Sequence, residues 1–142
     1  MKHVLPYLIF DGDCREAMRF YHQCLGGELF EMTFGEAEAP SPPEAKDRLV
    51  HAAVKRGEFL LMASDTMPGM PFTIGNNVSV YLACDSDDEV QSLYDQLTKG
   101  GKEGMAPHDA FWGARFAMLT DRFGVNWMLA HEHAPAGSTA GA

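Results

Sequence analysis

The fold is decided by Tyr7-Leu8-Ile9-Phe10-Asp11-Gly12-Asp13, because this stretch is echoed 74 residues later by Tyr81-Leu82-Ala83-Cys84-Asp85-Ser86-Asp87. The pair Gly26-Gly27 is echoed at the same offset by Gly100-Gly101. Two separate matches at one offset indicate an internal repeat. The sequence therefore predicts one structural module that is present twice.

Each copy has the same predicted order of elements. A β-rich run, at 3–10 and again at 77–84, leads into a helix with apolar residues at helical spacing. Asp13 with Glu16, and Ser86 with Glu89, have the spacing of a helix capping box, and a Gly-Gly pair ends each helix. Strand-like segments follow at 28–34, 49–55 and 59–64, and at 102–105, 114–120 and 125–130. We therefore expect an α+β fold of paired βαβββ modules.

The predicted elements also set the domain boundaries. We expect a single domain over 1–133, with module one at 1–65, a linker at 66–76 and module two at 77–133. The proline-rich segment 35–47 predicts a mobile loop, because proline interrupts strand pairing. Residues 134–142 are small and turn-forming, which predicts a disordered tail.

Length, composition and charge exclude several classes of protein. A chain of 142 residues that is 46% hydrophobic and 22% charged is typical of one globular domain. Eleven Lys and Arg against twenty Asp and Glu give a net charge of −9, and the basic residues are scattered. This balance argues against nucleic acid as a partner, because phosphate binding needs clustered cations. The same charge would repel anionic membranes.

Cysteine content and the apolar runs predict a cytoplasmic location. Cys14, Cys24 and Cys84 are odd in number and lack Cys-x-x-Cys spacing, so we expect free thiols and a reducing compartment. No apolar run approaches the ~18 residues that a membrane-spanning helix needs, and no signal-peptide pattern follows the first residues. We therefore expect no membrane partner.

A family resemblance rests on several stretches that together span residues 6–129. The most specific is Phe111-Trp112-Gly113 followed by Thr120-Asp121-Arg122-Phe123-Gly124-Val125-Asn126-Trp127-Met128-Leu129. The others are Pro6-Tyr7-Leu8, Phe20-Tyr21, Leu25-Gly26-Gly27-Glu28, Phe34-Gly35-Glu36 and His51-Ala52. With the paired modules, they resemble the vicinal-oxygen-chelate superfamily of glyoxalase I, bleomycin-resistance proteins and extradiol dioxygenases, and within it the PhnB-like branch, sometimes labelled 3-demethylubiquinone methyltransferase-like. The resemblance implies a curled sheet from each module, a ligand cavity between them and a homodimer.

The resemblance also implies where a catalytic metal would be held. In the enzymes of this superfamily, four strand residues, typically His, Glu or Gln, hold a divalent ion that polarises the substrate. The matching positions here are Pro6, Leu61, Ser79 (or Tyr81, if the register slips by two) and Met128. Because these side chains are poor ligands for such an ion, we predict no metal and no other cofactor. A divalent metal is expected only if this alignment is wrong.

His51 is the candidate catalytic residue, because it lies in an otherwise apolar strand and belongs to the His-Ala pattern of the branch. It would act as a general base or hydrogen-bond a ligand, and the alternative is a histidine on the outer sheet face. Trp112 and Phe116 are candidates for stacking on a planar ligand, although core packing explains them equally well. The predicted ligand-binding cavity comprises Pro6, Leu8, Leu61, Ser79, Tyr81, Trp112, Phe116, Asn126 and Met128.

His131-Glu132-His133 is a possible metal clip, because alternate residues of a strand share a face. A solvated strand end that leads into the tail is the favoured interpretation.

The leading functional hypothesis is a small-molecule-binding protein of the glyoxalase/bleomycin-resistance type that works without metal. Its acidic surface would suit a cationic ligand through weak, salt-screened attraction. One alternative is a metal-dependent glyoxalase or dioxygenase-type enzyme with a rearranged site, using His51 with Glu28, Glu31 or Asp65. Another is a non-catalytic structural or interaction protein. Methyl transfer is not expected, because the sequence has no recognisable cofactor-binding glycine loop.

Overall fold

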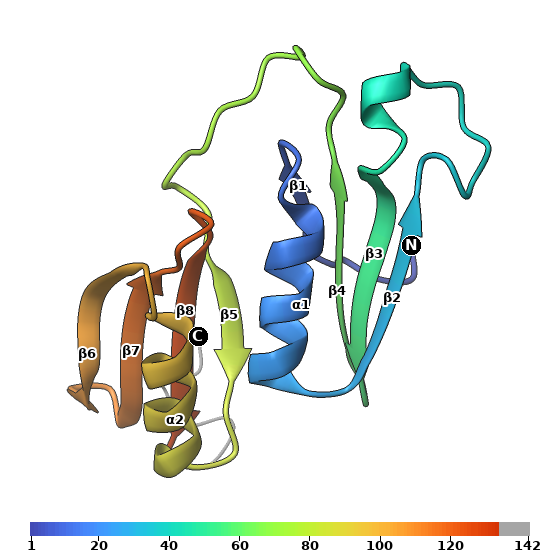
Figure 1. Ribbon diagram of the computed structural model, residues 1–142. Coiled ribbons are helices and arrows are strands. Elements are labelled where there is room, and N and C mark those ends of the chain that lie inside the picture. The colour runs from blue at the N-terminus through green and yellow to red at the C-terminus, as the bar shows by residue number, and fades with distance from the viewer. Residues whose placement is uncertain (134–142) are drawn as a thin grey trace. The chain divides into compact units, whose positions relative to one another are not determined.

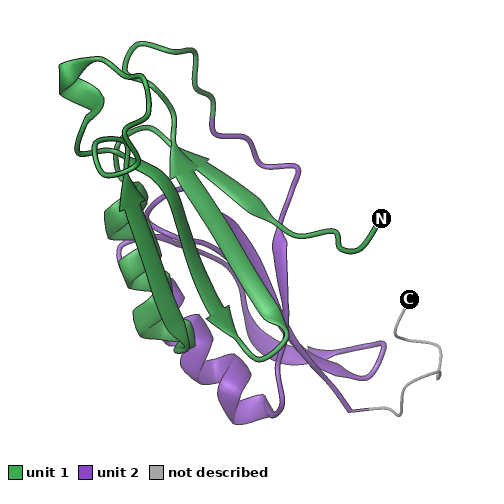
Figure 2. Cartoon of the chain, turned by 90° about the vertical axis from the view of Figure 1, so that its right-hand side faces the viewer, with its two compact units in different colours: residues 1–73 green, residues 74–142 purple. Residues whose placement is uncertain are grey.

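The computed structural model describes residues 1–133, so the tail predicted at 134–142 lies outside the described residues. The chain divides into two compact units, Met1–Thr73 and Ile74–Ala142 (Figure 2). Within residues 1–133, each unit holds one α-helix and one four-stranded sheet (Figure 1). The expected α+β architecture of two related modules is therefore confirmed.

The first unit contains β1 (Tyr7–Phe10), α1 (Cys14–Leu25), β2 (Glu28–Thr33), a 3₁₀ turn η1 (Pro43–Ala45), β3 (Leu49–Arg56) and β4 (Phe59–Asp65). The strand order is β1-β4-β3-β2, with β1 parallel to β4 and the other pairs antiparallel. The proline-rich segment contains turns and η1 and no strand.

The second unit repeats this plan. It contains β5 (Val80–Ala83), α2 (Asp87–Leu97), β6 (Lys102–Ala110), β7 (Ala114–Thr120) and β8 (Asn126–Glu132). The strand order is β5-β8-β7-β6. Strand β5 is parallel to β8, as β1 is parallel to β4 in the first unit. The first strand of each unit is shorter than predicted. In the first unit this agrees with Pro6, which has no N–H to donate.

The helix covers one face of each sheet, and the core lies between them. In the first unit, Ala52, Val54, Leu61 and Ala63 are on the α1 side and are at most 3% exposed. In the second unit, the residues buried on the α2 side are Ala117, Leu119, Trp127 and Leu129. The opposite face of each sheet is called the helix-free face below.

The two helices begin in different ways. At α2 the Ser86 hydroxyl accepts a hydrogen bond from the Glu89 N–H at 3.0 Å, as predicted, and the Glu89 carboxylate accepts one from the Asp85 N–H. At α1 the side chain of Asp13 makes no capping hydrogen bond, so that prediction is wrong. The carboxylate of Asp65, at the end of β4, accepts from Gly12 and Cys14 N–H groups instead. A cap from 51 residues away leaves no local signal in the sequence.

No helix among residues 1–133 is long and apolar enough to cross a membrane.

Candidate functional site

His51 lies on the helix-free face of the first sheet. It pairs with Met32 of β2, and it alternates with Ala52, which faces α1. Its Nδ1 atom is 3.1 Å from the Tyr7 hydroxyl oxygen, and the two rings stack with centroids 5.8 Å apart. The Phe30 ring lies on β2 with its centroid 6.1 Å from that of His51. The hydrogen-bonded pair of Tyr7 and His51 and the Phe30 ring thus form one aromatic cluster, with one residue from each of β1, β3 and β2.

This aromatic cluster is accessible. Tyr7 is 43% exposed and Phe30 is 48% exposed, while Ile9, two residues along β1 from Tyr7, is 50% exposed. Apolar side chains this exposed and this close together form a patch that a ligand can cover. Tyr7, Ile9, Phe30 and His51 are called the first-sheet patch below.

The predicted cavity residues of module one lie elsewhere. Leu61 is 3% exposed and packs on the α1 side of β4. Leu8 pairs with Ala63, so it also belongs to the α1 side. Pro6 is exposed and precedes β1. The residues of β4 that alternate with Leu61 towards the helix-free face are Leu60 and Met62.

The predicted residues of module two share the helix-free face of the second sheet. Tyr81 and Met128 are direct neighbours in β5 and β8, and Met128 alternates with Trp127 and Leu129, which are buried under α2. Phe116 in β7 points to the same side, and Trp112 packs against it with ring centroids 5.3 Å apart. Phe116 is only 5% exposed, whereas Tyr81 is 51% exposed. Ser79 is half-buried and directly precedes β5.

Asn126, also on this face, has hydrogen-bond partners within the protein. Its carbonyl oxygen accepts from the Thr120 hydroxyl at 2.7 Å, and its amide nitrogen donates to the backbone of Val78 at 3.3 Å. It also borders a shallow pocket of about 470 Å³ whose lining includes Ile74, Lys102 and Arg122. Asn126 therefore anchors the segment before β5 and contributes to the wall of this pocket.

The residues that the family resemblance aligns with the superfamily's metal ligands do not fit a divalent ion. Leu61 and Pro6 have no donor atom in their side chains, and Leu61 is buried against α1. Ser79 offers only a hydroxyl and Met128 only a thioether, and both are weak ligands for a hard ion. No step that depends on a metal can be derived at these positions.

The carboxylates considered for a rearranged site do not all converge on His51. Glu31 pairs with Ala52 on the α1 side and forms an ion pair with Arg19 at 2.8 Å. Asp65 is 5% exposed and engaged in capping α1. Glu28, the first residue of β2, is exposed. It pairs with Lys55 and lies on the helix-free face, as His51 does.

Sequence reasoning missed the partners of three histidines. Tyr7 and Phe30 lie beside His51 because of strand alternation and the sheet order, and the spacing of residues in the sequence gives only the alternation. Asp87 was not recognised as the partner of His131 and His133, which lie 44 and 46 residues away in the chain. The 74-residue repeat gives no signal for this contact. The residue of the first copy that matches Asp87 is Asp13, and the sequence pattern pairs neither residue with a histidine.

Comparison with known proteins places this fold in a family. The family model of the glyoxalase/bleomycin resistance protein/dioxygenase superfamily matches residues 1–129. Protein YjdN of Escherichia coli is 31% identical over 135 residues, which cover 87% of this chain and 91% of YjdN. The crystal structure of PA1353 from Pseudomonas aeruginosa is 44% identical, with a TM-score of 0.84 over 93% of this chain and 98% of that one.

More distant structures share the fold alone. The PhnB protein of Bacillus cereus is 23% identical with a TM-score of 0.75, over 92% of this chain and 99% of that one. A bleomycin resistance determinant encoded on the transposon Tn5 is 18% identical with a TM-score of 0.57, over 94% and 100%. The repeat, the two sheets and the family match agree, and the chain belongs to the glyoxalase/bleomycin resistance protein/dioxygenase superfamily, also called the vicinal-oxygen-chelate superfamily.

Proposed function

We propose that this protein binds a small molecule on the helix-free face of a sheet, first of all that of the first unit, and that binding does not require a metal. The observation that carries the proposal is the first-sheet patch, in which the His51–Tyr7 hydrogen bond is surrounded by half-exposed apolar side chains. Ligand sites commonly combine apolar and aromatic walls with a few polar groups that fix orientation. An amphipathic ligand with an aromatic or alkyl part and one hydrogen-bonding group suits this patch.

The second sheet supports the same function. Tyr81, Met128 and Trp112 contribute aromatic or adaptable apolar surface, and Ser79 contributes a hydroxyl group near the start of β5. Thioether side chains adjust to irregular ligands, and aromatic rings stack on planar ones. The net charge of −9 favours cationic over anionic ligands through weak, salt-screened attraction. The protein is proposed to act in the cytoplasm as a homodimer, and light scattering of the purified chain measures its oligomeric state.

The donor chemistry of the residues supports the proposed metal independence. The residues aligned with the superfamily's ligand positions are Pro6, Leu61, Ser79 or Tyr81, and Met128, and they offer neither imidazole nor carboxylate. Leu61 faces α1, and its neighbours towards the helix-free face, Leu60 and Met62, offer neither group either. Around His51, the contacting side chains are Tyr7 and Phe30, which also supply no carboxylate. Binding would then rest on apolar burial and hydrogen bonds.

The experiment is a thermal-shift screen with planar aromatic cations and neutral amphiphiles, followed by calorimetric titration of the compounds that raise the melting temperature. In Phe30→Ala, about half of a phenylalanine surface is lost from the site, worth about 1 kcal/mol or a roughly fivefold increase in Kd. Met70→Ala is the matched control, since Met70 is 56% exposed, close to the exposed fraction of Phe30, and lies in the segment between β4 and β5. Equal affinities of the two variants, or no stabilising compound in the library, would contradict the proposal.

A second candidate function is catalysis of proton transfer by the same patch. The contact between His51 Nδ1 and the Tyr7 hydroxyl favours it, because an oriented imidazole is suited to act as a general base. His51→Gln retains hydrogen-bonding capacity and removes the base. Turnover of a bound compound that is lost in His51→Gln while affinity persists supports catalysis. Unchanged turnover in this variant contradicts it.

A further inference from the structure

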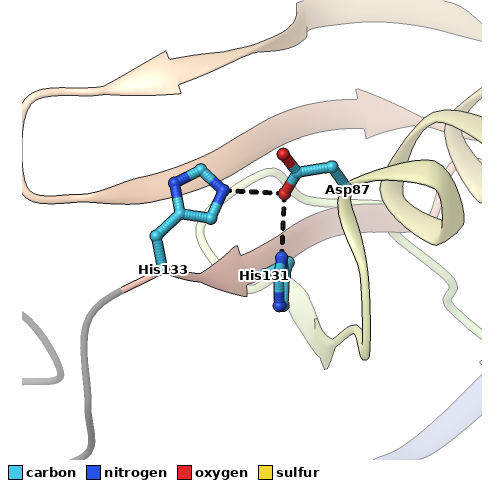
Figure 3. Close-up of side chains that lie close together, drawn as sticks. All are labelled: Asp87, His131 and His133. Carbon is cyan, nitrogen blue, oxygen red and sulfur yellow. Dashed lines mark hydrogen bonds and ion pairs between the residues drawn. The ribbon is translucent and has the colours of Figure 1, made fainter.

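Asp87, His131 and His133 form a compact side-chain cluster in the second unit (Figure 3). Asp87 is the first residue of α2, His131 is the last residue but one of β8, and His133 directly follows that strand. One carboxylate oxygen of Asp87 lies 2.8 Å from His131 Nδ1 and 2.7 Å from His133 Nε2. The three potential donor atoms all lie within 4.8 Å of one another. Alternation along the strand brings both imidazoles to the side of α2.

The cluster is not needed to cap the helix. Ser86 and Glu89 already satisfy N–H groups at the start of α2. The cluster therefore links the end of β8 to the start of α2 in addition to the hydrogen bonds that cap α2.

The internal repeat sharpens this point. In the first unit, Asp65 at the end of β4 pairs with Phe10 and accepts hydrogen bonds from Gly12 and Cys14 at the start of α1. The register of β5 with β8, extended by one residue, places His131 at the corresponding position of the second unit. The same strand end thus carries a capping carboxylate in one copy and an imidazole in the other. His133 adds a second imidazole two residues later.

We propose that Asp87, His131 and His133 bind a divalent transition-metal ion of the zinc class. Two imidazoles and one carboxylate are a donor set that such ions accept, whereas Mg²⁺ and Ca²⁺ prefer oxygen ligands. The site lies under the α2 side of β8, so it is separate from the helix-free faces and from the positions aligned with the superfamily's metal.

The geometry requires moderate side-chain movements. Ligand atoms placed about 2.1 Å from a tetrahedral ion are about 3.4 Å apart, so the two contacts of Asp87 would open by about 0.6 Å. The three donor atoms now lie within 4.8 Å of one another, so the widest separation would close by up to about 1.4 Å. The exposed side-chain fractions are 49% for Asp87, 30% for His131 and 39% for His133, which leaves room for this adjustment. The proton on each ring nitrogen that donates to Asp87 would move to the other nitrogen of that ring, which leaves a lone pair on the first nitrogen for the ion.

Three protein ligands leave a fourth coordination position for water or another small ligand. Within residues 1–133 this is the single grouping of three or more His, Cys, Asp or Glu side chains with ligand-compatible spacing, and residues 134–142 contain none of these types. Bound metal would cross-link the end of β8 to the start of α2 and raise the stability of the second unit.

The test uses the full chain without a polyhistidine tag, stripped with EDTA and titrated with Zn²⁺ against a coloured chelator. We expect about one ion per chain and a rise in melting temperature that grows with free Zn²⁺. Co²⁺ should give the visible absorption of a nitrogen-ligated, low-coordinate ion. His133→Gln and Asp87→Asn should each weaken binding at least tenfold, and His131→Gln/His133→Gln should abolish it.

His51→Gln and His108→Gln are the matched controls, because each removes one imidazole outside the cluster. Both should retain one Zn²⁺ per chain. No retained ion in the wild type, or equal retention in the double variant, would overturn the proposal. The small-molecule titrations of Phe30→Ala report separately on the first-sheet patch, so failure of one proposal is distinguishable from failure of the other.

Discussion

Asp65→Asn tests whether the Asp65 carboxylate stabilises the first unit by holding the starts of α1 and β3. The Asp65 carboxylate is 5% exposed and accepts three backbone hydrogen bonds, from Gly12 at 2.8 Å, Cys14 at 3.0 Å and Leu49 at 2.9 Å. It thereby joins the start of α1 to the start of β3. Asparagine has the same shape, but its amide nitrogen cannot accept a hydrogen bond, and the residue carries no negative charge.

The expected loss follows from these contacts. The side-chain amide of asparagine would turn one N–H group towards the Leu49 N–H or the Gly12 and Cys14 pair, leaving at least one buried donor unsatisfied. Such a group costs about 1–3 kcal/mol, and removal of a negative charge from a helix N-terminus costs about 0.3–2 kcal/mol. We expect a loss of roughly 2–4 kcal/mol in the free energy of unfolding. For a chain of this length that is roughly 8–16 °C in melting temperature, at about 4 °C per kcal/mol.

The assay is circular dichroism at 222 nm during heating, because both tryptophans, Trp112 and Trp127, lie in the second unit and their fluorescence would favour that unit. Asp11→Asn is the matched control. Asp11 is a neighbouring carboxylate whose contact with Arg48 is a surface ion pair, worth about 0–1 kcal/mol. A melting temperature of Asp65→Asn equal to that of Asp11→Asn would refute the reasoning.

Two further predictions concern reactivity and ligand binding. Burial, with the charges of Asp65 and Asp13, raises the pKa of Cys14 to about 12, and burial with the charge of Glu89 raises that of Cys84 to about 11. At pH 8 a disulfide reagent should therefore modify Cys24 first, and three equally fast thiols in the folded protein would contradict this. Ser79→Trp should weaken binding of a screened compound by about tenfold or more while the protein still folds, and unchanged affinity would show that Ser79 lies outside the site.

The repeat made the architecture predictable, whereas the direction of single side chains was harder to predict. Matching segments 74 residues apart were enough to foresee two modules, because each module repeats its strand and helix signals in the same order. The sequence predicts Leu8 and Leu61 as cavity residues, but they lie on the α1 side of the sheet. A one-residue change of register moves every side chain of a strand to the other face. Sequence alone does not fix the alternation across a hairpin.

Contacts between distant segments were the other part that sequence could not supply. Asp65 replaces Asp13 as the cap of α1, and Asp87 meets His131 and His133, because parallel strand pairing brings the end of the last strand to the start of the helix in each unit. The His51 environment is similar, since Tyr7 reaches it from β1. Such contacts depend on strand order, which the spacing of residues along the chain does not specify.

The measurement that most directly tests the central claim is calorimetric titration of the strongest compound from the screen into two samples of the protein, one stripped with EDTA and one loaded with Zn²⁺. Binding on a helix-free face without a metal predicts the same Kd in both samples, and a higher Kd in Phe30→Ala than in Met70→Ala. Loss of binding in the stripped sample, restored by Zn²⁺, would contradict the account.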